Sequence, residues 1–426
     1  MNKRQGFVPI LLIVLALVVS VGGVGIGLAW KTDVFDKWLP PNIKELFGRG
    51  EKNDGVGTEG IKKLAFLKGG QVWIVNKDGT GLTQLTRVSG EIGEFHFSPD
   101  GKFLGYVLEK EFVPESQVKL GYEVRELELS TGQERILVKS LDNSVIVEIA
   151  KLWDSFAIGL NGFSYFPDGS KIIFSRMGVW TLDRSTGETR KLLSGTSPKE
   201  IDIIDESRAV YGDFINWSPS GNKVLITKFK YGGTVDVVLD LIDGSETSVS
   251  LRGVGGTYAI DFSDNDTLLV LSVDAGPSEE AIYTAPIQAM DKQSVIYRTT
   301  IEDLSSIALA KNSGRVIFSA TSNLEFSQTN EEVPPPKLKD NTLYSVNLDG
   351  NDLQQHVDLG YDPENRLGIY LISVGSGDEE ITFYVDYSPS GVSDNDELRI
   401  LDLEAGSHDL LARGKIVQIE WVTISE

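Results

Sequence analysis

The stretch Phe95–Val107 reads FHFSPDGKFLGYV, and its pattern recurs along the 426-residue chain. An apolar segment leads into Pro99-Asp100-Gly101, and a second apolar segment follows. Proline presets φ for the second position of a turn, Asp tolerates the third, and Gly accepts a positive φ at the exit. The stretch therefore predicts a β-hairpin with a short turn.

Four other stretches share this plan, with a large apolar residue at the third position, then a turn, then β-branched or aromatic residues. They are FSYFPDGSKIIFS (163–175), INWSPSGNKVLIT (215–227), IDFSDNDTLLVLS (260–272) and IALAKNSGRVIFS (307–319). A hairpin tends to be followed by two more strands joined by a D/S-x-G turn, as in VWTLDRSTGETRKLL (179–193). Four strands per unit, repeated at intervals of roughly 45 to 68 residues, are typical of propeller blades.

The two ends of the predicted domain complete one another. Residues 61–86 contain KKLAFL, QVWIVNKDG and LTQLT with no inner strand before them, whereas KIVQIEWVTIS from Lys415 is an inner strand with no blade after it. We therefore predict an all-β propeller over 61–426 whose C-terminal strand joins the first blade and leaves no free sheet edge. Seven four-stranded blades follow, with inner strands near residues 97, 165, 217, 262, 309, 371 and 420.

The stretches FSPDGKFLGYV, YFPDGSKIIFS and NWSPSGNKVLI, together with VWIVNKDGTGLTQLT, resemble the TolB-like, WD-like propeller repeat. The same repeat occurs in the propellers of prolyl peptidases, and the resemblance covers about residues 61–426. It implies the fold rather than a function, because one fold hosts many functions. TolB-like proteins carry a small α/β domain before six blades, and prolyl peptidases add an α/β-hydrolase domain. Neither domain is recognisable here, so the roles of those proteins are not carried over.

The first sixty residues predict a membrane anchor. Residues 1–6 carry Lys3 and Arg4, and residues 7–30, FVPILLIVLALVVSVGGVGIGLAW, contain no charge. Such a segment is long enough to cross a bilayer as a helix, and the basic residues are expected on the cytoplasmic side. Residues 31–60 then form a juxtamembrane segment and flexible linker, which places 61–426 outside the cell in a single-pass membrane protein. A cleaved signal peptide is the alternative reading of the same segment.

The composition excludes several kinds of catalytic and metal site. The chain has no cysteine, which excludes disulfides, thiolate metal sites and a cysteine nucleophile. Its net charge of −22 makes nucleic acid an unexpected partner. There is no G-x-S-x-G elbow, and the only histidines, His96, His356 and His408, fall in different predicted blades. We therefore assign no catalytic residue and no histidine metal site, and the sequence favours a binding protein over an enzyme.

One candidate cation motif occurs twice. The tetrapeptide SDND is found at 263–266 and 393–396, and clustered oxygen ligands of this kind suit Ca²⁺. An Asx-rich turn explains the same residues without any metal. We expect no cofactor, and Ca²⁺ is the one metal that the motif leaves open.

The long connections predict where a partner binds. The Pro-Asp-Gly turns are short and alike, whereas segments 109–121, 141–159, 230–236 and 321–341 are long and varied, as recognition loops on a rigid scaffold tend to be. The predicted binding residues are the apolar ones in these loops, Phe112, Trp153, Phe156 and Phe326.

The leading hypothesis is a membrane-anchored extracytoplasmic module that binds a protein or glycan through its loop-rich face. An ectoenzyme, a hydrolase using carboxylates at the axis of the ring, and a structural envelope protein are the alternatives.

Overall fold

The computed structural model describes most of the chain after residue 60. The described ranges are 61–113, 118–139, 160, 162–176, 178–194, 210–230, 233–251, 256–273, 280–299, 302–322, 341–360, 368–375, 377–378, 380–387, 396–403 and 406–424. In these ranges no helix is long and apolar enough to cross a membrane. The predicted anchor at 7–30 and the linker at 31–60 lie outside the described residues.

The described residues form seven four-stranded antiparallel sheets, which we call blades A to G. Blade A contains β28 (Ile416–Ile424), β1 (Ile61–Lys68), β2 (Gln71–Asn76) and β3 (Thr83–Gln84). Blade B contains β4 (Glu91–Phe97), β5 (Phe103–Val113), β6 (Val118–Glu128) and β7 (Glu134–Val138). Blade C contains β8 (Gly162–Tyr165), β9 (Lys171–Ser175), β10 (Gly178–Asp183) and β11 (Thr189–Ser194). Blade D contains β12 (Val210–Trp217), β13 (Lys223–Lys230), β14 (Gly233–Asp240) and β15 (Glu246–Ser248).

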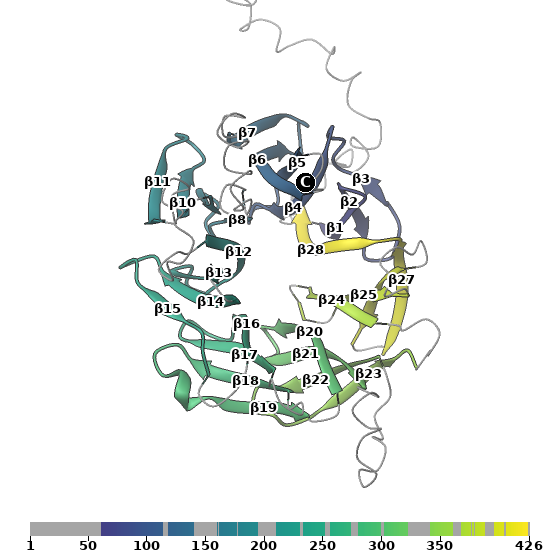
Figure 1. The fold of residues 1–426 in the computed structure, drawn as a ribbon. Coiled ribbons are helices and arrows are strands. Elements are labelled where there is room, and N and C mark those ends of the chain that lie inside the picture. Colours follow the sequence, from purple (N-terminus) through teal and green to yellow (C-terminus); the bar gives the residue numbers. More distant parts are fainter. Residues whose placement is uncertain are drawn as a thin grey trace, which may run out of the picture. The chain divides into compact units, whose positions relative to one another are not determined.

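The remaining blades repeat the same order from the inner to the outer strand. Blade E contains β16 (Gly256–Phe262), β17 (Thr267–Val273), β18 (Glu280–Pro286) and β19 (Ser294–Thr299), with a short 3₁₀ helix at Met290–Lys292. Blade F contains β20 (Glu302–Ala310), β21 (Arg315–Ser322), β22 (Thr342–Asn347) and β23 (Gln354–Asp358). Blade G contains β24 (Gly368–Val374), β25 (Glu380–Asp386), β26 (Glu397–Asp402) and β27 (Ser407–Arg413). Neighbouring inner strands contact one another around the whole ring, so the predicted seven-bladed propeller is confirmed (Figure 1).

The ring closes as the sequence predicted. Strand β28 pairs antiparallel with β1, with Ile424 opposite Ile61, so the C-terminal strand lies beside the first strand of the domain (Figure 1). The side chain of Gln418 also binds blade B: its Oε1 accepts from the Phe95 amide at 3.0 Å, and its Nε2 donates to the Phe95 carbonyl at 2.6 Å. The closing strand therefore fastens blade A to blade B as well as completing blade A.

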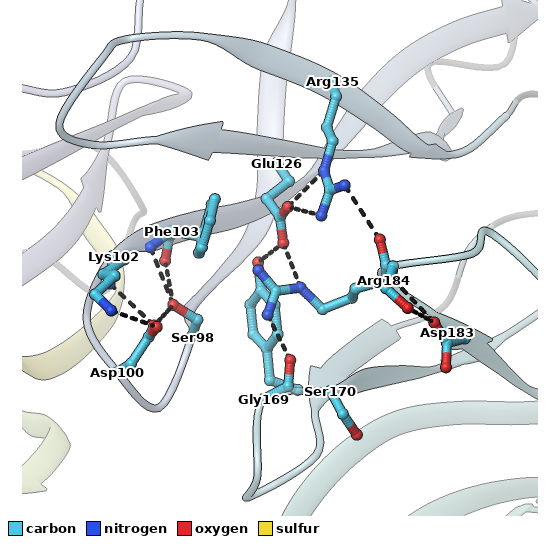
Figure 2. Close-up of polar contacts among 12 residues, drawn as sticks. Ser98, Asp100, Lys102, Phe103, Glu126, Arg135, Gly169, Ser170, Asp183 and Arg184 are labelled. Atoms are coloured by element: carbon cyan, nitrogen blue, oxygen red, sulfur yellow. Dashed lines mark hydrogen bonds and ion pairs between the residues drawn. The ribbon is translucent and has the colours of Figure 1, made fainter.

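The turn that follows β4 has the predicted conformation. Gly101 has a φ of +66°, and its amide donates to the Ser98 carbonyl at 2.8 Å. The Ser98 hydroxyl donates to Asp100 Oδ1 at 2.6 Å and accepts from the Phe103 amide at 3.0 Å (Figure 2). A Cβ added at Gly101 would lie 1.9 Å from the Thr423 carbonyl oxygen of β28. Glycine is therefore required here both by the turn and by the closing strand that crosses it.

The core lies between the blades, because each sheet is covered on both faces by its neighbours. The largest side chains with almost no exposure include Phe66, Phe95, Phe163, Phe262, Phe318 and Phe383. The third-position residues of the repeat are also buried in four blades, at Phe97, Tyr165, Phe262 and Leu309. Burial on both faces explains why the middle strands are nearly continuous runs of apolar residues rather than alternating ones.

The inner strands share one irregularity that the sequence did not predict. In six of the seven blades the pairing between the inner strand and the next strand shifts by one residue, which is a β-bulge. The extra residue is Gly93 in β4, Ile260 in β16, Ser306 in β20 and Val417 in β28. Bulges re-aim side chains and are common next to functional sites.

Candidate functional site

A cavity of about 490 Å³ lies along the axis of the ring, against the inner strands of blades D to G. Its apolar wall includes Ile260 of β16, Ile307 and Leu309 of β20, and Ile372 of β24. All of these residues lie in the second half of their strands, toward the turn that leads into the second strand. Four blades thus contribute to one concave site, and each contribution is held by a hydrogen-bonded inner strand.

An ion pair crosses two of these blades at the edge of the cavity. The Lys311 ammonium lies 3.0 Å from Asp261 Oδ1, and the same carboxylate oxygen accepts from the Phe262 amide at 2.7 Å. The Asp261 side chain is 9% exposed, whereas that of Lys311 is 45% exposed. Burial raises the pKa of Asp261 above its ordinary value, although the Lys311 ammonium acts in the opposite direction. A partly exposed cation therefore covers a buried carboxylate.

Blade G contributes a second carboxylate to the same cavity. Asp378 is 8% exposed and lies in the turn between β24 and β25 with a φ of +62°. Its Oδ2 accepts from the Ser313 amide of blade F at 2.5 Å. This hydrogen bond joins the first turns of blades F and G, so the Asp378 carboxylate is already engaged within the protein.

Two polar side chains at the cavity are available to a ligand. In the part of the chain that the structure describes, the side-chain amide of Asn216 and the hydroxyl of Ser373 form no hydrogen bond within the protein. The amide can donate and accept, and the hydroxyl can also do both. The site combines an apolar wall, a bridged ion pair and two uncommitted polar groups.

His96 occupies the opposite part of the ring, where β4 meets β28. Its Nε2 lies 2.9 Å from Glu94 Oε1, and its Nδ1 lies 3.2 Å from Glu420 Oε2. Glu420 Oε1 also accepts from the Phe97 amide at 3.0 Å. Burial alone would lower the pKa of His96, but the carboxylates of Glu420 and Glu94 outweigh it and raise the pKa to about 10. His96 is therefore a cation that holds the closing strand against blade B.

The other two histidines lie on the fourth strands of two different blades, His356 on β23 and His408 on β27. Among the described residues, no three His, Asp or Glu side chains are grouped so as to hold a metal ion.

A buried carboxylate forms a clamp between blades B and C. Glu126 of β6 has a fully buried side chain and lies 2.8 Å from Arg184 Nε and 2.5 Å from Arg135 Nη2 (Figure 2). The Tyr165 hydroxyl of blade C donates to Glu126 Oε1 at 2.9 Å. The Arg184 guanidinium also donates to the Gly169 carbonyl and stacks 4.6 Å from the centre of the Phe103 ring. All four groups are satisfied by one another, so we assign this cluster to stability.

Other buried carboxylates join neighbouring blades in the same way. Asp236 of β14 accepts from the Ala259 amide of blade E at 2.7 Å, and Glu280 of β18 accepts from the Leu304 amide of blade F at 2.5 Å. In both cases a third strand satisfies the backbone of the next inner strand. These carboxylates thus have a structural role.

The structure places only one of the predicted binding residues. Phe112 belongs to β5, which continues to Val113, and β6 begins at Val118, so the prediction that Phe112 lies in a loop is wrong. The predicted loop at 230–236 is also wrong, because β13 ends at Lys230 and β14 begins at Gly233. In both hairpins the strand pairing continues through polar residues that we had predicted to form a loop. Trp153, Phe156 and Phe326 lie outside the described residues.

The first SDND motif forms a turn that contacts blade D. The Asp266 amide donates to Asp264 Oδ1 at 2.8 Å, which is an Asx turn. Asn265 Oδ1 accepts from the Ser220 amide at 2.7 Å, and Lys223 lies 2.6 Å from Asp266 Oδ1. These oxygens are therefore used within the protein. Of the second motif, 393–396, only Asp396 is described, and it accepts from the Tyr384 hydroxyl at 2.5 Å.

Comparison with known proteins supports the fold only. No family model matches the chain, and no curated protein matches it. Among solved structures, a prolyl endopeptidase matches 81% of this chain and 46% of its own, with 10% identity and a TM-score of 0.53. An oligogalacturonate lyase of Vibrio parahaemolyticus matches 84% and 87%, with 13% identity and a TM-score of 0.50. TolB of Acinetobacter baumannii matches 71% and 65%, with 15% identity and a TM-score of 0.39. The predicted resemblance to the propellers of prolyl peptidases is thus confirmed as a likeness of fold.

Proposed function

We propose that the chain is a membrane-anchored extracytoplasmic binding module whose propeller holds a protein or glycan partner at its axis. The observation that supports this function is the axial cavity, where four blades surround an apolar wall with the uncommitted side chains of Asn216 and Ser373. A concave site on a rigid scaffold, with polar groups placed to orient a ligand, is typical of ligand-binding sites.

In this proposal the helix at 7–30 anchors the protein and the linker at 31–60 sets its reach from the membrane. The partner approaches from the loop-rich face, where Trp153, Phe156 and Phe326 add contacts, and a part of it enters the channel. The net charge of −22 disfavours a polyanionic partner such as nucleic acid.

Capture from solubilised envelope membranes on the full-length chain tests the proposal. Ser373→Trp would fill the cavity, and Ile242→Trp adds the same bulk at a turn residue that is 76% exposed. We expect the wild type and Ile242→Trp to retain a partner that Ser373→Trp loses. Equal recovery by all three proteins would count against an axial site. Protease added to intact cells should cleave the propeller, and full protection would contradict the extracytoplasmic location.

One observation favours an ectoenzyme as a second candidate function. Asp261 and Asp378 line the same cavity, and the raised pKa of Asp261 is a property that general acids require. The full-length chain should then hydrolyse a glycoside or peptide, and Asp261→Asn should abolish turnover while the variant still folds. Absence of turnover across both substrate classes would remove this candidate.

A further inference from the structure

The axial cavity combines the two kinds of surface that a long basic side chain needs. Its wall carries the aliphatic side chains of Ile260, Ile307 and Ile372, which can pack against the methylene groups of such a side chain. Two carboxylates, those of Asp261 and Asp378, line the same cavity from blades E and G. An aliphatic surface and a charged acceptor are thus available to one ligand.

Each of the two carboxylates has one oxygen that the protein does not use. Asp261 is held through Oδ1, by the Lys311 ammonium and the Phe262 amide, and Asp378 is held through Oδ2 by the Ser313 amide. Among the described residues no group donates to Asp261 Oδ2 or Asp378 Oδ1, and the buried side-chain atoms that lack a partner lie elsewhere. Both oxygens therefore reach the open space of the cavity.

The other uncommitted groups of the cavity can also accept hydrogen bonds. They are the side-chain carbonyl of Asn216 and the hydroxyl of Ser373, which have no hydrogen-bond partner in the described part of the chain. A guanidinium group has five N–H donors in a planar fork and no acceptor. A cavity whose open groups are mostly acceptors, two of them charged, therefore suits a guanidinium.

The charge around the axis favours a cation. Five of the seven inner strands, within the bounds given above, contain an acidic residue, and none contains a lysine or an arginine. The cation that lines the cavity is Lys311, in the turn after β20, and its ammonium is paired with Asp261. The whole chain carries a net charge of −22. Such a field raises the local concentration of cationic groups and disfavours anionic ones.

We infer that the axial cavity receives an arginine side chain of a protein partner, whose guanidinium takes the place of the Lys311 ammonium beside Asp261. In this exchange Asp261 keeps a cation throughout, so no buried charge is left unpaired. The Lys311 side chain is already 45% exposed, and its displaced ammonium moves into water. Lys311 is thus an internal substitute for the cation of the ligand. The inference rests on the proposed binding function and specifies its partner.

Calorimetric titration of the full-length chain in detergent tests the inference. The probes are capped peptides Ala-Ala-X-Ala-Ala in which X is arginine, citrulline or glutamate, and a tetramer of glucosamine represents a cationic glycan. Citrulline has the size of arginine without its charge. At about 0.15 M salt the charges of the open surface are largely screened. We expect the arginine peptide to bind at least about tenfold more tightly than the citrulline peptide, because hydrogen bonds between charged groups are the stronger ones. The glutamate peptide should not bind.

Two variants of the buried ion pair should change the affinity in opposite directions. Lys311→Met removes the competing ammonium and should tighten the arginine peptide several-fold, whereas Asp261→Asn should weaken it by about tenfold or more. Asp409→Asn removes the same charge from an exposed position on the outer strand β27 and should change the affinity less than about twofold. A ligand that binds to Lys311 itself would be weakened by Lys311→Met, and that result overturns the inference.

The remaining outcomes separate the inference from the proposed function. Equal binding of the arginine and citrulline peptides overturns the inference on the wild type alone, so it decides even where a variant fails to fold. Binding of the glucosamine tetramer in place of the arginine peptide overturns the ligand class and leaves the binding module standing. If no probe binds but Ser373→Trp still loses its membrane partner, the inference fails and the proposed function stands. If no probe binds and Ser373→Trp captures the same partners as the wild type, both fail.

Discussion

Gly101 offers the sharpest test of how the propeller closes. The change Gly101→Ala places a methyl group 1.9 Å from the Thr423 carbonyl oxygen and 3.0 Å from its carbon, and both atoms belong to the backbone of β28. Gly169 occupies the equivalent turn of blade C with nearly the same φ, +69° against +66°, yet the nearest atom to its added Cβ is Pro99 Cδ at 3.6 Å. Both glycines therefore have the left-handed backbone that strains an alanine, but only Gly101 lies against the closing strand.

The difference between the two variants measures the contact with the closing strand. Alanine in the left-handed region costs roughly 1–2 kcal/mol at either site. Overpacking against a fixed backbone adds about 1–3 kcal/mol at Gly101 alone. We therefore expect Gly101→Ala to lower the free energy of unfolding by about 2–5 kcal/mol, and Gly169→Ala by about 1–2 kcal/mol. The unfolding entropy of a domain of this length is on the order of 0.8 kcal/mol/K, so Gly101→Ala should melt roughly 1–4 °C below Gly169→Ala.

The assay is thermal unfolding of both variants and the wild type under one buffer condition, followed by circular dichroism of the β signal. Limited proteolysis should in addition release C-terminal residues earlier from Gly101→Ala, because the clash displaces the end of β28. Equal melting temperatures for the two variants would refute the reasoning, since the turn would then tolerate the methyl group without moving the closing strand.

Three other changes test the contacts that join the blades. Glu126→Gln leaves two guanidinium groups beside a buried amide and should lower the free energy of unfolding in urea by about 3–5 kcal/mol. Glu134→Gln, at an ion pair whose carboxylate is 36% exposed, should lower it by less than about 1 kcal/mol. Similar losses for both variants would show that burial does not decide the cost. Ending the chain at Arg413 removes β28, which carries the buried side chains of Ile416, Val422 and Ile424. The loss of stability is at least about 5 kcal/mol, which approaches the whole stability of many domains. The truncated protein should therefore be protease-sensitive at 25 °C, and an unchanged melting temperature would disprove closure by this strand. In NMR titration of the imidazole C–H signals, one histidine should titrate near pH 10 and disappear in His96→Gln, while the other two, whose pKa values burial and a neighbouring arginine lower, should titrate below pH 6.5. Because the folded pKa of His96 exceeds its ordinary value, its stabilisation is complete below about pH 6.5 and is lost as the pH rises through about 10, so the stability difference between the wild type and His96→Gln should shrink over that range.

The architecture was predictable because its signals are local. The turn at Pro99-Asp100-Gly101 and its copies fix hairpins through backbone preferences of single residues, and hairpins at regular spacing imply blades. The closing strand was recognisable because the first blade lacks an inner strand and the C-terminal segment Ile416–Ile424 has no blade of its own. The turns needed only the residues within one repeat, and the closure needed only a comparison of the two ends of the domain.

The axial site was not predictable, because its features depend on residues that are far apart in the chain. The bulge at Ile260 is set by pairing with β17 and packing against neighbouring blades, and no local motif marks it. Asp378 meets Ser313 across 65 positions, and Glu126 meets Arg184 across 58. The chain has 62 acidic residues, and nothing in the sequence distinguishes those that join blades from those that face the channel.

The position of β1 has a mechanical consequence. Residues before Ile61 enter the propeller through a strand that is flanked on both sides, by β28 and by β2, rather than through an edge strand. A pull exerted through the preceding segment must therefore shear two hydrogen-bonded ladders together, one of which belongs to the opposite end of the chain. Tension at the N-terminal side is resisted by the C-terminal strand, so the domain should withstand stretching better than one whose entry strand lies at a sheet border.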